Sequence, residues 1–336
     1  MRSLSNPELV ILTVLYVVTF LIALLGNSFL ICIVWKVRQV RSFTSILFVN
    51  MAVADLMVTL FVMPLTVYDF QADFRWTMSG VLGDVTCRAV WYLKYISMMA
   101  SILCLTFMTT DRFFNLIFPL KSLNVFFRNP KYVSPLIWAM SMVLMSVIPV
   151  MFKFYEDIQV CAVYPVGGSK WKTNLRAIHI YLFLVTYLVP LVVMTVLNGK
   201  MAHVIWFNPT HGRELPEDQQ EQHEIIKRRM ARVLIIIVVV FAVCWLPAQV
   251  YILFQAVVVF QKEWPIIVGF LSFWLAHVNS AINPWLFILL MENMRRTFLE
   301  ILGKKTQEDR GETVRQTAQR PKVTSGSTEL IPLAPV

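Results

Sequence analysis

Four polar side chains lie within long apolar stretches of the chain, where burial away from water is costly. Asp55 lies in the second stretch, Ser101 in the third, and Asn279 and Ser280 in the last. A carboxylate in hydrocarbon needs partners, which hydroxyl and amide groups of neighbouring helices can supply. A hard cation would supply more, because such ions take oxygen ligands. The four residues therefore predict a sodium site, with a purely structural hydrogen-bond network as the alternative.

The elements that must position these side chains are long apolar blocks. Hydrophobic residues make up 57% of the 336 residues and charged residues only 15%, against about 25% charged in a soluble domain. Each block exceeds the roughly 20 residues that a helix needs to cross about 30 Å of hydrocarbon. Backbone groups in lipid must be paired internally, so we expect an all-α fold, a seven-transmembrane helix bundle. The blocks lie at roughly 9–34, 43–68, 86–118, 132–152, 176–206, 232–260 and 265–290.

The chain ends flank this bundle. Residues 1–8 are expected to form a short extracellular N-terminus, 9–302 the membrane domain with a juxtamembrane helix, and 303–336 a disordered cytoplasmic tail. Phe298, Ile301 and Leu302 share one helical face. That spacing predicts a short amphipathic helix after the seventh span, lying on the inner membrane surface.

The distribution of basic residues predicts the orientation. Most of the 30 Lys and Arg residues lie in the loops after spans one, three and five or in the tail. The positive-inside rule then places the C-terminus in the cytoplasm and the N-terminus outside, in a multi-pass protein of the plasma membrane. The net charge of +10 is therefore mainly a topology signal. A nucleic-acid partner is not expected, because no basic soluble domain is present.

The placement of the 5 cysteines favours one disulfide. Cys87 lies at the outer start of the third span and Cys161 in the second outer loop, and only these two face oxidising space. The alternative is two unpaired thiols. Residues 152–164 around Cys161 alternate in polarity, which predicts a hairpin that covers the mouth of the bundle.

Short motifs distributed over all seven spans point to one family. Asp111-Arg112-Phe113 ends the third span, Cys244-Trp245-Leu246-Pro247 lies in the sixth, and Asn283-Pro284-Trp285-Leu286-Phe287 in the seventh. Single residues accompany them at matching positions: Gly26, Asn27, Asp55, Trp76, Cys87, Pro119, Leu120, Trp138 and Pro190. In this order and spacing, the chain resembles a rhodopsin-like (class A) G-protein-coupled receptor.

The resemblance implies a switch between an outer ligand and an inner heterotrimeric G protein. In this family the Arg at position 112 pairs with Asp111 at rest and docks against the G protein when active. Trp245, beside the Pro247 kink, would sense the ligand and shift the inner half of the sixth helix. The residues expected to serve coupling are Asp111, Arg112, Pro119, Leu120, Trp245, Pro247, Asn283, Pro284 and Phe287. Arrestin and receptor kinases are further expected partners through the Ser/Thr-rich tail, as are membrane lipids.

The chain departs from the family pattern at the inner side. Phe113 and Phe287 replace tyrosines, and Asn198 stands where the fifth span usually carries one. Lys227 occupies the position at which some members place an acidic partner for the Arg. The usual inter-helix lock is therefore expected to be absent.

The resemblance also locates a pocket. Lys94 stands where amine receptors carry an Asp, so an amine ligand would be repelled, and His277 stands where opsins carry the retinal-linked Lys. The expected ligand-binding residues are Lys94, Tyr95, Met98, Trp245, Gln249, Ile252, Phe273 and His277. For Lys94 the alternative is a partner within the protein, such as Asp69, or extension toward water. For His277 the alternative is a buried histidine with a structural role.

These features predict a receptor for a neuropeptide-type ligand. A small acidic or lipid ligand would also suit Lys94. A transporter is the alternative from another class, but internal repeats and broken helices are not evident. An enzyme is not expected, since metal-ligand clusters and catalytic motifs are missing. No cofactor is expected, apart from a sodium ion as allosteric modulator.

Overall fold

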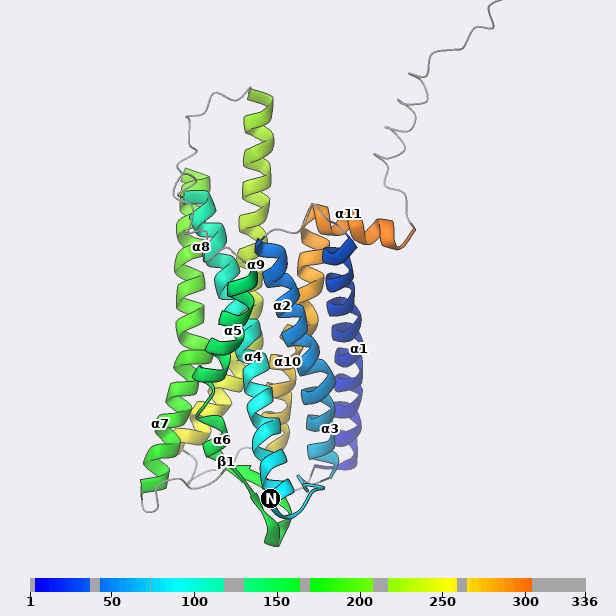
Figure 1. The fold of residues 1–336 in the computed structure, drawn as a ribbon, viewed down its shortest axis with the longest axis vertical. Helices are drawn as coiled ribbons and strands as arrows, with labels where there is room; N and C mark the ends of the chain where they lie inside the picture. Colours follow the sequence, from blue (N-terminus) through cyan, green and yellow to red (C-terminus); the bar gives the residue numbers. More distant parts are fainter. Residues whose placement is uncertain are drawn as a thin grey trace, which may run out of the picture.

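The computed structural model describes residues 4–36, 43–72, 74–117, 130–163, 170–207, 217–258 and 265–303. Within them, seven helices are long and apolar enough to cross a membrane, which confirms the predicted bundle (Figure 1). The spans are α1 (Asn6–Lys36), α2 with α3 (Phe43–Met57 and Met63–Gln71), α4 (Gly80–Ile117), α5 with α6 (Pro130–Leu144 and Ile148–Met151), α7 with α8 (Trp171–Phe183 and Val189–Phe207), α9 (Glu217–Val258) and α10 (Ile266–Leu290).

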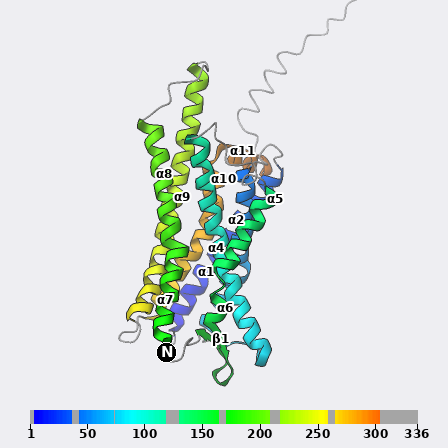
Figure 2. The same cartoon turned by 60° about the vertical axis from the view of Figure 1, so that its left-hand side comes forward.

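Several helices extend further than the apolar blocks do, and α4 and α9 show this most clearly. α4 begins at Gly80, several residues before the predicted start of its span. α9 begins at Glu217, well inside the stretch that polarity alone would assign to a loop. Residues 217–231 consist largely of Glu, Gln, Lys, Arg and Ala, which are good helix formers without an apolar face. α9 therefore projects beyond the other helices (Figure 2).

Two spans contain a π-helical turn next to a proline. Val58–Val62 precedes Pro64, and Leu184–Leu188 precedes Pro190. A proline lacks the N–H that closes an α turn, and its ring collides with the carbonyl four residues earlier. The wider i→i+5 turn relieves both constraints. Pro190 is one of the residues that match the family pattern, whereas nothing in the sequence analysis pointed to Pro64.

α4 is the central helix of the bundle, packed against α2, α5 and α8. Its inner face carries fully buried side chains, including Met99, Ile102 and Met108. Phe241 of α9 and Phe287 of α10 complete the same core. The exposed apolar residues lie mostly on the outer faces of the spans, as expected where lipid replaces water.

α1 and α10 approach closely at Gly26. A Cβ atom at Gly26 would lie 2.6 Å from Nε1 of Trp285, and that Nε1 donates a hydrogen bond to the Ile22 carbonyl at 3.2 Å. The rings of Phe29 and Phe298 contact each other and Trp285. Only glycine permits this packing, which fastens α10 and the following helix to α1.

The predicted helix after the seventh span is present as α11 (Glu292–Ile301). It crosses the end of the bundle at a steep angle to the spans (Figure 1). Met294 is buried and Phe298 packs against the core, while Arg295 and Arg296 are exposed. The helix is therefore amphipathic.

A β-hairpin lies at the opposite end of the bundle (Figure 1). Its antiparallel strands are β1 (Phe152–Tyr155) and β2 (Val160–Val163), with Phe154 opposite Cys161. A 3-10 turn at Glu156–Ile158 and the left-handed Gln159 (φ 52°) connect them. The predicted hairpin is thus confirmed.

Candidate functional site

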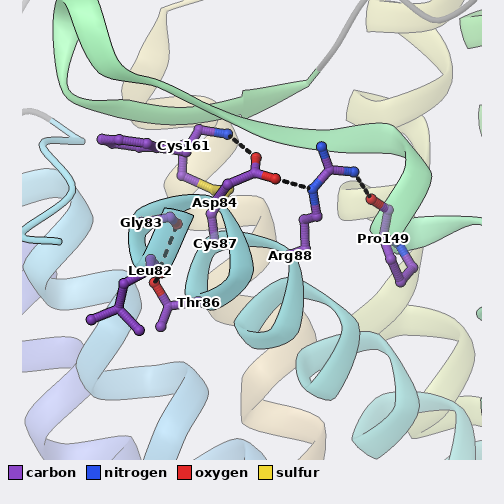
Figure 3. A network of polar contacts seen from close by, with 9 residues as sticks. Leu82, Gly83, Asp84, Thr86, Cys87, Arg88, Pro149 and Cys161 are labelled. Carbon is purple, nitrogen blue, oxygen red and sulfur yellow. Dashed lines mark hydrogen bonds and ion pairs between the residues drawn. A yellow bond between two sulfur atoms is a disulfide. The ribbon is translucent and has the colours of Figure 1, made fainter. Parts of the chain in front are cut away.

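A disulfide and an ionic clamp fix the hairpin to the start of α4. Cys87 and Cys161 form the predicted disulfide. Asp84, one turn earlier, accepts a hydrogen bond from the backbone N of Phe154 at 3.1 Å and another from Nε of Arg88 at 2.8 Å. Arg88 also donates through Nη1 to the Pro149 carbonyl at 2.7 Å (Figure 3). α4 therefore holds both strand β1 and the short helix α6 that precedes it.

The first outer loop joins the same assembly. The backbone N of Trp76 donates to the Gln159 carbonyl at 2.7 Å, and its Nε1 donates to Thr86 at 3.1 Å. Arg75 forms a β-bridge with Val160. Two outer loops thus form one rigid rim, anchored on α4.

Lys94 lies in an aromatic environment beneath this rim. Its Nζ is 4.7 Å from the ring centroid of Trp91 and 5.5 Å from that of Phe273. The Trp91 ring stacks on Phe152 of strand β1, with centroids 4.2 Å apart and planes 9° apart. Within the described residues, no carboxylate lies within ion-pair distance of Lys94. Asp69 is nevertheless close enough for its charge to act on the lysine, so the internal partner considered above is present at longer range. The hairpin, a cation and two rings are therefore contiguous.

His277 and Gln249 already have partners within the protein. The Tyr16 hydroxyl lies 3.2 Å from Nδ1 of His277, and the two rings pack edge to face. Gln249 donates through Nε2 to Thr186 Oγ1 at 3.3 Å. Both side chains are buried. This geometry agrees with the structural alternative for His277, and contact of either residue with a ligand stays a prediction.

The other predicted pocket residues lie on α4, α9 and α10 around the same space. Met98 packs between the two hydrophobic clusters, and Tyr95 and Phe273 pack against the larger one. Trp245 is buried, and its Nε1 has no hydrogen-bond partner in the described chain. Ile252 is half-buried. Asp73, which the sequence places near the mouth, lies outside the described residues.

The predicted cation site contains buried oxygen atoms without partners. Ser280 Oγ donates to Oδ1 of Asp55 at 3.0 Å. Oδ2 of Asp55, Oγ of Ser101, Oδ1 of Asn279 and the Asn283 side chain make no hydrogen bond of full geometry among the described residues, although Ser101 and Asn283 lie close enough to Asp55 to stabilise its carboxylate. Such atoms are costly in a low dielectric unless something binds them. The donor set, one carboxylate with hydroxyl and amide oxygens, fits a hard cation.

The inner end of the bundle contains a small cavity beside Arg112. Arg112 lines it together with Thr44, Phe48, Met108, Val233, Leu234 and Phe287, from four of the helices, and with Met291, which connects α10 to α11. Thr44 Oγ1 donates to Oδ2 of the buried Asp111 at 3.3 Å. The Phe287 ring packs on Phe48 with centroids 4.4 Å apart, so an apolar contact occupies the place of the missing tyrosine hydroxyl.

Three other predicted switch residues are on α9 and α10. Pro247 and Pro284 lie inside α9 and α10, and Asn283 is fully buried. Pro119 and Leu120 lie outside the described residues, as do the serines and threonines of the tail. The expected absence of an acidic lock at Lys227 is not tested, because its side chain is not described.

A different ion pair links α9 to α11. Arg229 Nη1 lies 2.7 Å from Oε2 of Glu292, and Arg229 Nε donates to the Leu290 carbonyl at 3.2 Å. Arg296 Nη2 holds the other carboxylate oxygen at 2.8 Å. The hydrogen bond from Arg296, with the charges of the neighbouring arginines, holds the pKa of the Glu292 carboxyl below its usual range. The carboxylate is therefore charged at neutral pH.

Several contributors to these sites were missed from the sequence. Trp91 lies one turn before Lys94 on the same helical face, and Asp84 and Arg88 have the i,i+4 spacing of an ion pair, so local patterns could have revealed them. Tyr16 and the Arg229–Glu292 pair come from distant segments. No local spacing predicts such contacts.

The seven-span bundle, the disulfide-tied hairpin and the motif positions define a class of membrane receptor. The family model for the 7 transmembrane receptor (rhodopsin family) matches residues 26–287. The chain therefore belongs to the rhodopsin family of seven-transmembrane receptors, and is a receptor rather than an enzyme.

Among its relatives, an allatostatin-A receptor of Bombyx mori is 28% identical over 291 residues, covering 84% of this chain and 76% of the relative. A QRFP-like peptide receptor of Branchiostoma floridae is 26% identical, covering 89% and 79%. A galanin receptor 2a of Danio rerio is 26% identical, covering 88% and 79%.

Proposed function

We propose that this chain is a plasma-membrane receptor that binds an extracellular neuropeptide and activates heterotrimeric G proteins through movement of α9. Its N-terminus is outside the cell and its C-terminus in the cytoplasm. The observation that carries the proposal is Lys94, a cation that contacts aromatic faces and forms no ion pair among the described residues, while the Asp69 carboxylate acts on it only from beyond ion-pair distance. It lies beneath a hairpin that a disulfide ties down.

The environment of Lys94 selects the chemistry of the ligand. Rings stabilise an ammonium by about 0.5 to 2 kcal/mol, whereas a cation removed from water favours an anionic partner more strongly. An acidic side chain or a terminal carboxylate of a peptide would supply that partner. A ligand ammonium would be repelled.

The hairpin favours an extended ligand. The rim consists of Trp76 in the first outer loop and the hairpin of β1 and β2. It is rigid because α4 holds the hairpin through Cys87 and Asp84. A rigid rim provides side chains and backbone groups at the entrance without an entropic cost of ordering. The peptide receptors among the relatives are a second support for this ligand class.

A small acidic or lipid ligand is the second candidate. Lys94 would bind its carboxylate or phosphate equally well, and the aromatic rings would cover an apolar body. The two candidates differ in how much of the rim they use. A peptide needs the hairpin, whereas a small acid needs only the residues around Lys94.

Transmission to the G protein would follow α9. Trp245 lies in the core one turn below the predicted pocket residue Gln249, and Pro247, between them in sequence, cannot donate the helical hydrogen bond to the Val243 carbonyl. The inner half of α9 lines the cavity at Arg112 through Val233 and Leu234. Outward movement of this half would enlarge the cavity for the G protein. Arrestin and receptor kinases would act on the tail.

A sodium ion is proposed as an allosteric modulator. Asp55, Ser101, Asn279 and Ser280 would hold it through side-chain oxygens. When bound, the ion would neutralise the carboxylate and bring α2, α4 and α10 together, which favours the resting arrangement.

The test is ligand-evoked calcium release in cells that express the chain with a promiscuous G-protein α subunit. A neuropeptide library is screened beside organic acids, lipids and amines, and an N-terminal epitope on intact cells reports orientation and surface level. A peptide hit whose potency falls at least tenfold in Lys94→Gln, but not in the exposed Lys170→Gln, supports the proposal. A hit only among acids or lipids replaces the ligand class.

Arg112→Ala should abolish the response at unchanged surface level, and a retained response would contradict the switch.

A further inference from the structure

A groove lies between α4 and α8 at the Arg112 end of the bundle. Its described lining is Phe113, Ile117, Gly199, Lys200, His203 and Val204. It is separate from the cavity that Arg112 lines, since the two share no described residue. It is also remote from Lys94, which lies toward the hairpin end of α4. Neither the predicted pocket nor the predicted G-protein contacts use this groove.

The lining combines apolar residues with two basic side chains. Lys200 and His203 lie three residues apart on α8, so both point to one side of the helix, and both are exposed. No carboxylate of the described residues pairs with Lys200. At Gly199, an added Cβ would meet no atom within 4 Å. The groove is therefore open at this glycine and positively charged at one end.

Aromatic residues next to the groove set its depth in the membrane. Phe207 lies against the His203 ring, with centroids 5.3 Å apart, and is 74% exposed. Trp206 is also exposed. Exposed aromatic side chains at the end of a span favour the boundary between headgroups and acyl chains. His203 thus lies close to this boundary, and Lys200, about two turns to the membrane side of Phe207, reaches it through its long side chain, while Phe113 adds apolar surface deeper in the membrane.

We propose that this groove binds the headgroup of an anionic phospholipid in the cytoplasmic leaflet. The lipid phosphate lies between Lys200 and His203, and an acyl chain runs from there past Phe113 toward the membrane centre. Basic recesses between spans on the cytoplasmic side suit such headgroups, because that leaflet contains the anionic lipids that basic side chains attract. The apolar part of the lining selects a lipid over a free phosphate ion. The leaflet assignment rests on the proposed orientation, whereas the lipid chemistry does not.

The test is native mass spectrometry of the purified full chain with phosphatidylserine or with phosphatidylcholine of the same acyl chains. The expected result is retained phosphatidylserine at several times the level of phosphatidylcholine. Lys200→Gln should lower that excess at least threefold, and Gly199→Leu, which fills open space, should do the same. Lys36→Gln removes an exposed lysine at the same end of the bundle, on α1, and should leave the excess unchanged.

Other outcomes overturn the assignment. Equal lipid retention in wild type and in both groove variants would exclude the groove as the site. Displacement of the lipid by inorganic phosphate would indicate an anion site without lipid specificity. Thermal unfolding of each variant excludes misfolding as the cause of a loss. None of these measurements requires a ligand or a G protein, so they are independent of the proposed function.

Discussion

Arg229 and Glu292 form a salt bridge of 2.7 Å between the inner part of α9 and the first turn of α11. α11 is itself fastened to α1 through Phe29, Phe298 and Trp285. The bridge therefore connects the helix that is proposed to move with a part of the bundle that is held fixed. We expect it to restrain α9 in place of the lock that an acidic residue at Lys227 would otherwise provide.

Removal of this bridge should raise basal signalling. A half-exposed pair contributes roughly 0.2–1 kcal/mol, so Glu292→Gln should shift the resting equilibrium by up to about fivefold toward the active arrangement. The measurement is ligand-free G-protein activation, normalised to surface level. Glu300→Gln, an exposed change on the same helix, should have no effect.

Because the pKa of Glu292 is depressed, its stabilising contribution is present at neutral pH and disappears only as pH falls through that lowered pKa. Basal activity that did not rise in Glu292→Gln would show that the bridge does not restrain α9.

Loss of the disulfide should destabilise the outer rim. Cys87 and Cys161 are 74 residues apart in sequence, and a crosslink over such a loop typically contributes about 2–4 kcal/mol. Cys161→Ala should lower the unfolding temperature and surface level. The free, exposed Cys32 provides the control variant Cys32→Ala. If Cys87→Ala and Cys161→Ala both matched wild type in unfolding temperature, the bond would be dispensable.

The Asp84 clamp should govern how firmly strand β1 is held. Asp84→Asn keeps an acceptor for the Phe154 amide but brings an NH2 group toward Arg88, and the lost interaction is about 1 kcal/mol for a half-exposed group. Hydrogen–deuterium exchange of residues 152–155 should accelerate by roughly fivefold. Asp157→Asn, at the exposed tip of the hairpin, should not change it. Unaltered exchange in Asp84→Asn would assign the positioning to the disulfide alone.

Sodium should stabilise the receptor through Asp55. A ligand at ten times its Kd adds about 1.4 kcal/mol to stability, which is a rise of roughly 2–5 °C in unfolding temperature for a protein of this size. The rise should occur with sodium chloride, be weaker with potassium chloride, and vanish in Asp55→Asn and Ser101→Ala. An equal response to both salts, or a full sodium effect in Asp55→Asn, would show that Asp55 does not bind sodium and serves only in a hydrogen-bond network.

The features that the sequence predicted depend on local patterns. Seven spans follow from apolar length, the disulfide from the placement of Cys87 and Cys161, and the hairpin from alternation. The features that it missed depend on how helices are rotated against each other. Arg229 has several acidic residues as conceivable partners in the sequence, and only the packed position of α11 selects Glu292. The hydrogen bond of His277 with Tyr16 is likewise set by the contact of α1 with α10, across 261 residues of sequence.

The π turns at Val58–Val62 and Leu184–Leu188 have a consequence for how chain length can vary. Each holds about one residue more than an α turn, so deletion of that residue leaves a regular helix with both flanking segments facing as before. Elsewhere in a span, a one-residue deletion rotates everything beyond it by about 100°. Within the described bundle, these turns are therefore where sequences of different length can share one arrangement of helices. Alignments of such sequences should place single-residue gaps there.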